Sequence, residues 1–80
     1  MFIFVYVLKS LTAPKSYVGM TDDLNRRLEE HNSGKHSYTK RYVPWEIIYK
    51  EEFSNYSDAR KREKYLKSAS GRRFLKKLFN

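Results

Sequence analysis

The amino-acid sequence predicts an α+β fold, in which a small three-stranded, mainly antiparallel sheet is flanked by helices in the order β-β-α-β-α-α. Residues 2–8 are apolar at every position, which is typical of a strand that is covered on both faces. Residues 21–32 and 57–67 begin with small polar or acidic side chains and then carry apolar side chains at helical spacing. These patterns together favour helices packed against a sheet.

Length and composition limit the possible architecture. Eighty residues without cysteine predict one domain, covering residues 1–80, that has neither disulfides nor a thiolate zinc site. The lack of cysteine is consistent with the cytosol, so we expect a cytoplasmic location. Residues 1–8 lack the basic start and the cleavage site of a signal peptide, and they are too short to span a bilayer.

The first two strands are expected to form an antiparallel hairpin. Side chains of residues 2–8 alternate between two apolar sets, so this strand should be central, with helices on either side. One set is Phe2, Phe4, Tyr6 and Leu8, and the other is Ile3, Val5 and Val7. Residues 10–15 form a loop, and residues 16–20 form the second strand.

A helix is expected to follow, beginning with Thr21 as its cap and ending near Asn32. The two aspartates after Thr21 suit the positive end of the helix dipole. Gly34 suits the left-handed conformation that commonly ends a helix. Leu24 and Leu28 are expected to form the core-facing stripe of this helix. Arg26 and Glu30 are expected to form an exposed i,i+4 ion pair.

The second half of the chain continues the pattern of strands and helices. Residues 35–44 form a basic, aromatic loop, and residues 45–53 form a third strand. A second long helix is predicted for residues 57–67. Residues 68–71 interrupt the helical pattern, and residues 72–79 form a last short helix.

The charge distribution favours a polyanionic partner. Lys and Arg total 17 against 9 Asp and Glu, for a net charge of +8. From Ala59 to Asn80, the only acidic residue among many basic ones is Glu63. DNA, RNA and an anionic membrane are the candidate partners, and a merely solubilising charge is the alternative. We favour a core-packed final helix over a membrane-surface helix and expect no membrane partner.

Glu63 is the first candidate for a chemical role. It shares one helix face with Ala59 and Leu66, and these two residues mark that face as directed inward. A carboxylate in such a position is either paired or functional, because an unpaired buried charge is very costly. A semi-exposed ion pair with Arg60 or Lys67 explains the pattern equally well.

Arg27 and His31 are the second candidates, because i,i+4 spacing makes their side chains neighbours on the first helix. A guanidinium can hold a phosphate with a planar fork of donors. A solvated arginine and a partly buried structural histidine are the alternatives. Tyr17 and Gly19 point to the same face of their strand, and the missing side chain of Gly19 is expected to leave an opening there. Tyr6 and Tyr17 can equally be cross-strand core aromatics.

The order of these residues resembles the GIY-YIG nuclease domain family. The similarity includes Tyr17-Val18-Gly19, the preceding strand with Tyr6, residues 23–35 and residues 62–68. Pro44-Trp45-Glu46 and residues 71–78 extend it over nearly the whole chain, and the closest resemblance is to small standalone members. Larger relatives include homing endonucleases and the incision subunit of bacterial nucleotide-excision repair.

This resemblance implies a Mg²⁺- or Mn²⁺-dependent endonuclease acting on DNA. Tyr6 and Tyr17 are the two motif tyrosines, one of which would help to deprotonate the attacking water, and Gly19 is the motif glycine. Arg27 would hold the scissile phosphate, and Glu63 would be the sole protein ligand of the metal. His31 occupies a position where the family uses His or Tyr. Basic residues expected to contact the nucleic-acid backbone are Lys35, Lys40, Arg41, Arg62, Lys67, Arg72 and Arg73.

The chain departs from the family pattern at three positions. The first motif reads Phe4-Val5-Tyr6, so only its tyrosine is retained, and Met20 stands where some relatives have a lysine. Asn80 is the only asparagine after the Glu63 helix and is assigned no role. We expect cleavage with low sequence specificity, with branched or damaged DNA as candidate substrates. A non-catalytic nucleic-acid-binding module and a protein-interaction domain that uses the aromatics of residues 35–42 remain alternatives.

Overall fold

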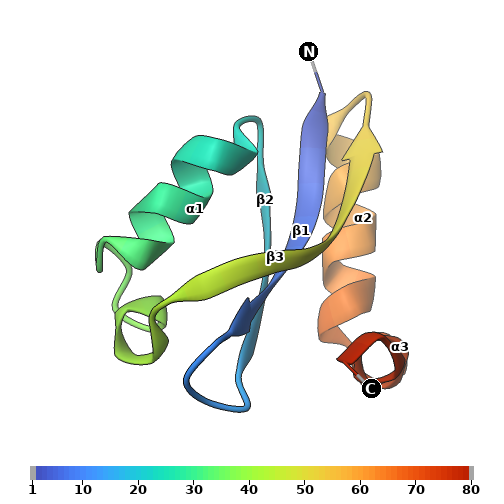
Figure 1. Cartoon of the computed structure of the whole chain (residues 1–80). Coiled ribbons are helices and arrows are strands. Elements are labelled where there is room, and N and C mark those ends of the chain that lie inside the picture. The colour runs from blue at the N-terminus through green and yellow to red at the C-terminus, as the bar shows by residue number, and fades with distance from the viewer. Residues whose placement is uncertain (1, 80) are drawn as a thin grey trace.

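A computed structural model describes residues 2–79 and contains one three-stranded antiparallel sheet, as the sequence predicts (Figure 1). Strands β1 (Ile3–Ser10), β2 (Ser16–Thr21) and β3 (Trp45–Phe53) are arranged in the order β2-β1-β3. Both neighbours of β1 run antiparallel to it. The prediction that β1 is the central strand is therefore confirmed.

Helices cover both faces of the sheet (Figure 1). Helix α1 (Leu24–Asn32) and the short 3-10 helix η1 (Thr39–Tyr42) lie on one side, and helix α2 (Tyr56–Lys67) packs on β1 and β2 from the other side. Helix α3 (Ala69–Phe79) packs against α2. The α+β class and the order β-β-α-β-α-α are both confirmed.

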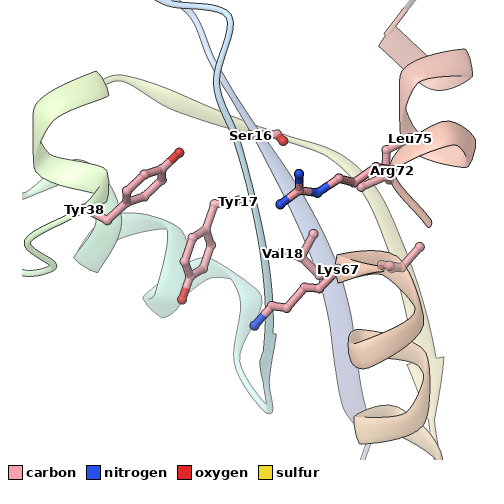
Figure 2. A pocket seen from close by; sticks show the side chains of 8 residues that line it. Ser16, Tyr17, Val18, Tyr38, Lys67, Arg72 and Leu75 are labelled. Carbon is pink, nitrogen blue, oxygen red and sulfur yellow. The ribbon is translucent and has the colours of Figure 1, made fainter. Parts of the chain in front are cut away.

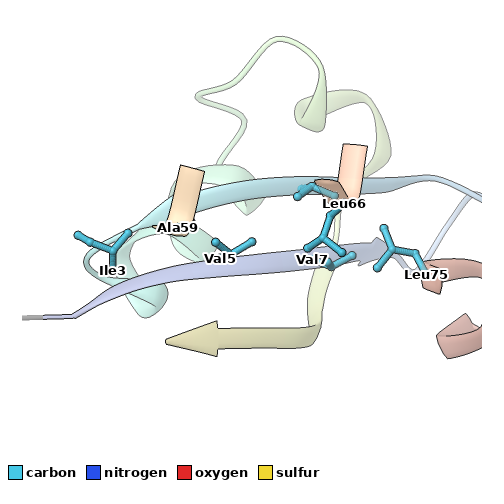
Figure 3. Packing of buried hydrophobic residues seen from close by; sticks show 7 residues of the cluster. Ile3, Val5, Val7, Ala59, Leu66 and Leu75 are labelled. Carbon is cyan, nitrogen blue, oxygen red and sulfur yellow. The ribbon is translucent and has the colours of Figure 1, made fainter. Parts of the chain in front are cut away.

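Each face of β1 supplies a separate apolar core. Side chains of β1 on one face meet Ala59, Leu66 and Leu75 of α2 and α3 (Figure 3). On the other face, Tyr6 and Leu8 pack with Trp45 at the start of β3, and leucines of α1 contact this second cluster. The alternation of the first strand therefore divides the protein into two cores that share one strand.

The start of α1 differs from the prediction by two residues. Thr21 is the last residue of β2, paired with Phe4, and its hydroxyl accepts a hydrogen bond from the backbone N–H of Asp23. The cap is Asp23, whose carboxylate accepts from the N–H of Arg26. Pairing with Phe4 keeps Thr21 in β2, and its hydroxyl is bonded to the N–H of Asp23, so the helix begins only after Asp23, whose carboxylate reaches the N–H of Arg26.

The expected exposed pair on α1 also differs, because Arg26 binds Asp22 and not Glu30. Asp22 is also four residues from Arg26, so the observed pair keeps i,i+4 spacing but lies toward the start of the helix, while Glu30 pairs with Arg27. Helix α2 starts at Tyr56 with Asn55 as its cap, one residue before the predicted Ser57.

The last helix begins at Ala69 instead of residue 72, although a break was predicted over residues 68–71. Ser68 alone interrupts the helices, with extended backbone. Its hydroxyl accepts from the N–H of Gly71, and its carbonyl accepts from the N–H of Arg72. These bonds cap α3, and Gly71 lies buried within that helix.

We expect Gly71→Ala to lower the free energy of unfolding by about 1–3 kcal/mol. An added Cβ would overlap the carbonyl oxygen of Tyr65 and the Cα of Leu66. Both are backbone atoms, which cannot rotate away, so the overlap exceeds the gain in helix propensity of about 1 kcal/mol. Urea denaturation measures the change, and exposed Ser70→Ala in the same helix is the control. A Gly71→Ala protein as stable as the wild type would contradict this packing.

Candidate functional site

The candidate site lies on the face of the sheet that carries Tyr6. Tyr6 on β1 is paired with Gly19 on β2, and the rings of Tyr6 and Tyr17 lie 6.4 Å apart between centroids. A Cβ at Gly19 would come within 2.5 Å of the phenol oxygen of Tyr6 and 3.0 Å of the Tyr17 ring. The expected opening at Gly19 is therefore filled by Tyr6, and the glycine allows this ring to lie flat against β2.

A chain of hydrogen bonds leads inward from Tyr6. Its hydroxyl lies 3.0 Å from Nε2 of His31, and Nδ1 of His31 lies 2.9 Å from Oγ1 of Thr39. The Thr39 hydroxyl can donate its proton to the carbonyl oxygen of His36, 3.5 Å away. In that arrangement Nδ1 of His31 donates to Thr39, and Nε2 of His31 accepts from the Tyr6 hydroxyl.

His31 is fully buried and neutral. Burial lowers its pKa to about 4, and the nearby positive charges of His36 and Arg27 act in the same direction. The His31 ring is stacked on that of His36 at 4.5 Å and lies 4.8 Å from the ring of Tyr17. His31 therefore matches the structural alternative of the sequence analysis, a buried and hydrogen-bonded histidine. Its Nε2 atom faces the hydroxyl of Tyr6.

We expect the free energy of unfolding to fall by about 2 kcal/mol between pH 7 and pH 5 because of His31. Its pKa is about 4 in the folded protein against an ordinary 6.5, so the unfolded chain binds more protons between these values. Stability is fully present above pH 6.5 and is lost as the pH falls toward 4. Urea denaturation of wild type and His31→Gln at both pH values checks this. The same pH dependence in both proteins would refute it.

Tyr6 is a weak acid in this environment. Burial raises its pKa to about 12; hydrogen bonding to Arg27 and the positive charge of Arg27 act against this shift, and the neighbouring Tyr17 and Glu63 add to it. Arg27 favours the phenolate form of Tyr6, but the effect of burial is larger. Tyr6 is therefore protonated at neutral pH and acts as a hydrogen-bond donor to His31.

Arg27 is half-buried on α1 and has unused donor capacity. One terminal nitrogen donates to Oε1 of Glu30 at 3.1 Å. Its Nε is buried and has no acceptor among residues 2–79. Removing a donor from water without a partner is costly, so this guanidinium gains stability from an added acceptor. A phosphate oxygen is the acceptor that matches its charge and fork geometry.

Glu63 lies on α2 and makes an ion pair with Lys67, with Oε2 at 3.3 Å from Nζ. Its side chain is 20% exposed, so the semi-exposed pair weighed in the sequence analysis is present, with Lys67 as the partner and not Arg60. Its charge also adds slightly to the raised pKa of Tyr6.

The donor set around Glu63 is compatible with one type of metal ion. The part of the chain that the structure describes contains no group of three His, Cys, Asp or Glu side chains arranged to hold a cation. A tightly held structural zinc therefore has no donor set there. Mg²⁺ commonly binds through one or two carboxylates together with water and substrate phosphate, and a single accessible glutamate suits that arrangement.

The predicted nucleic-acid contacts divide into two groups. Arg62 donates to Glu51 at 2.6 Å and lies over the rings of Tyr65 and Phe74, so its charge is already paired. The other residues are exposed: Lys35, Lys40, Arg41, Lys67, Arg72 and Arg73. Within residues 2–79, no helix is both long and apolar enough to cross a bilayer. Asn80 lies outside the described residues.

Two residues at the site were missed by the sequence analysis. Thr39 is fully buried and sets the hydrogen bonding of His31, and its carbonyl oxygen accepts from the indole of Trp45 at 2.8 Å. Tyr38 lies 6.2 Å from the ring of Tyr17. Both belong to the basic, aromatic loop, in which no periodic pattern distinguishes a buried threonine from an exposed one.

Comparisons with known proteins extend over the same residues. Residues 2–78 match the model of the GIY-YIG catalytic domain. A UPF0213 protein of Staphylococcus epidermidis is 38% identical over 74 residues, which are 91% of this chain and 89% of that protein. A UPF0213 protein of Staphylococcus aureus is 35% identical over 74 residues, which again are 91% of this chain and 89% of that protein. The solution NMR structure of a UPF0213 protein from Bacillus halodurans has a TM-score of 0.58 and 30% identity, covering 98% of this chain and 85% of that one.

Proposed function

Because this chain belongs to the GIY-YIG catalytic domain family, we propose that it is a metal-dependent endonuclease that hydrolyses phosphodiester bonds in DNA with low sequence specificity. The observation that supports this most is the meeting of the motif side chains at one site. Tyr6 contacts His31 directly, and Tyr17 lies beside both rings. These residues come from three different elements, β1, β2 and α1, and Arg27 lies one turn before His31 on α1.

In this proposal, Glu63 would hold Mg²⁺ or Mn²⁺ after releasing Lys67. When bound, the cation would stabilise the negative charge that develops on the leaving oxygen. Arg27 would bind the non-bridging oxygens of the scissile phosphate, where its unused donor adds charge stabilisation in the transition state. Lys67, once released, would be free to contact an adjacent phosphate.

His31 would orient the Tyr6 hydroxyl, whose oxygen lies 3.0 Å from Nε2. With a pKa of about 4, His31 is too weak a base to keep the proton of the attacking water, and Tyr6, with a pKa of about 12, is not ionised at neutral pH. Tyr17 would therefore be the motif tyrosine that helps to deprotonate the water. As the water oxygen bonds to phosphorus, the bond from phosphorus to the leaving oxygen breaks, and the proton of the water passes to solvent. Thr39 would hold the His31 ring in place.

We further propose that residues 1–80 act as a single nuclease domain in the cytoplasm. Contacts from the exposed basic residues would be made to the backbone, which carries no sequence information. Affinity should therefore depend strongly on salt and weakly on sequence.

A non-catalytic binding module is the second candidate, because the carboxylate of Glu63 is already paired with Lys67 and Tyr6 remains protonated at neutral pH. Neither side chain is then in the state that metal binding or proton abstraction requires. On that alternative, the basic surface binds DNA or RNA without a metal. Gel shifts in EDTA together with a nicking assay distinguish the two candidates.

We expect supercoiled plasmid to be nicked in Mg²⁺ or Mn²⁺ and to remain intact in EDTA, while a gel shift persists in EDTA. The reason is that phosphate contacts by Lys and Arg supply the affinity, and the metal supplies only the chemistry. Agarose electrophoresis over a range of metal concentrations measures the relaxed fraction. Binding without nicking at any metal concentration would favour the non-catalytic module.

A further inference from the structure

A hollow lined by Tyr17 lies where α3 approaches the start of β2 (Figure 2), and a second hollow adjoins it. Their volumes are about 330 Å³ and 340 Å³. They share four lining residues, which are Ser16, Tyr38, Arg72 and Leu75. A hollow of this volume is at the small end of ligand-binding pockets, and one nucleotide is a ligand of that size.

The first hollow is aromatic and apolar. Tyr17 and Tyr38 contribute rings 6.2 Å apart and tilted by 31°, and Leu75 lines the hollow from α3. Tyr38 is 45% exposed, which leaves its ring accessible. Exposed tyrosine rings are the surfaces on which single-stranded nucleic acids stack their bases.

The second hollow is basic, with Lys15 and Lys76 in its lining together with Arg72. Figure 2 shows Arg72 and Lys67 extending from the helices toward Tyr17. None of the described residues that line either hollow is acidic. An anion therefore meets only positive or neutral groups there, which is the charge complementarity that a phosphate requires.

We propose that these two hollows together bind one unpaired nucleotide next to the scissile phosphate, with the base on Tyr38 and its phosphate on Arg72. The inference rests on the proposed nuclease function, because Tyr17 belongs to both the candidate site and the first hollow. It assigns the substrate a structural class, which is DNA with an extrahelical base or a single-stranded end.

A paired base cannot occupy the first hollow without leaving its helix. In a duplex both faces of each base are covered by neighbours, and extrusion costs a few kcal/mol. This cost is lowest where the base is already mismatched or unpaired. The hollow therefore selects for DNA structure and not for sequence, because every base has a face that can stack.

The test is binding in EDTA, where cleavage cannot interfere. The probes are a short duplex with one extrahelical 2-aminopurine and the same duplex fully paired. Fluorescence anisotropy gives the affinity, and quenching of the 2-aminopurine reports stacking. We expect wild type to bind the extrahelical probe about tenfold more tightly. Tyr38→Phe should retain this preference, and Tyr38→Ser should abolish it.

Two charge variants complete the test. Arg72→Ala should weaken the binding of both probes, and Lys61→Ala, an exposed lysine on α2 that lines neither hollow, should leave the preference unchanged. Equal affinity of wild type for both probes, or a preference that survives in Tyr38→Ser, would overturn the proposal. A preference in a protein that never nicks would support the nucleotide site and reject the nuclease, so the two failures are distinguishable.

Discussion

Glu63→Gln is expected to reduce plasmid nicking by at least about 100-fold, the scale of losing one strong electrostatic contribution at an active site. Glutamine keeps the size of the side chain but replaces the carboxylate with a neutral amide. Mg²⁺ and Mn²⁺ bind carboxylates much better than amides in sites with few protein ligands. Nicking rates at saturating DNA, measured over a range of metal concentrations, report the loss.

The same substitution should barely change stability or DNA binding. The ion pair of Glu63 with Lys67 is partly exposed, and pairs of this kind contribute at most about 1 kcal/mol. Affinity for DNA in EDTA should be equal or slightly higher, since Lys67 becomes free. Glu29→Gln, an exposed acid on α1, is the matched control. Unchanged nicking by Glu63→Gln would remove the metal-binding role from this residue.

Arg27→Lys is expected to lower the nicking rate by about 100-fold or more while DNA affinity falls only slightly. Lysine keeps the charge but presents a single ammonium, whereas the guanidinium offers a planar fork of donors. The effect should therefore appear in the rate of the chemical step, because the fork is needed most when charge develops on the phosphate. Single-turnover nicking measures that rate separately from binding.

Arg26→Lys is the control for Arg27→Lys because the two residues are adjacent on α1. Arg26 is exposed and paired with Asp22, so its replacement should leave the rate unchanged. Glu30→Gln adds a second comparison, since Glu30 holds one end of the Arg27 guanidinium. Equal rate losses for Arg26→Lys and Arg27→Lys would indicate a general disturbance of α1 and would argue against a phosphate clamp.

The fold could be predicted because its strongest signals are local. A strand that is apolar on both faces has to be central, and β1 is central. The errors lie at element ends, where several residues can serve equally well. Thr21 and Asp23 both have cap-forming side chains, and only the pairing of Thr21 with Phe4 in the sheet decides between them. Gly71 resembles a helix breaker in sequence, but packing against Leu66 keeps it inside α3.

The order and spacing of residues along the chain identify Tyr6, His31 and Glu63 as candidates by resemblance, but they do not give the electrostatics around them. The raised pKa of Tyr6 depends on burial by distant segments, and the partner of Glu63 was one of two cations at helical spacing, Arg60 and Lys67. The contact of Thr39 with His31 depends on how the intervening turn folds, which no periodic pattern encodes.

The central position of β1 has a consequence for how the chain folds during synthesis. β1 is synthesised well before one of its two neighbours, β3, which begins at Trp45, and the core on one face is completed by Leu75. At typical translation rates this delay lasts seconds. During that time β1 has an unpaired edge and exposes apolar side chains on both faces. An unpaired, apolar strand edge is a template on which other chains can aggregate. Slowed translation after β2 should therefore reduce the soluble yield of this protein more than slowing near its last helix.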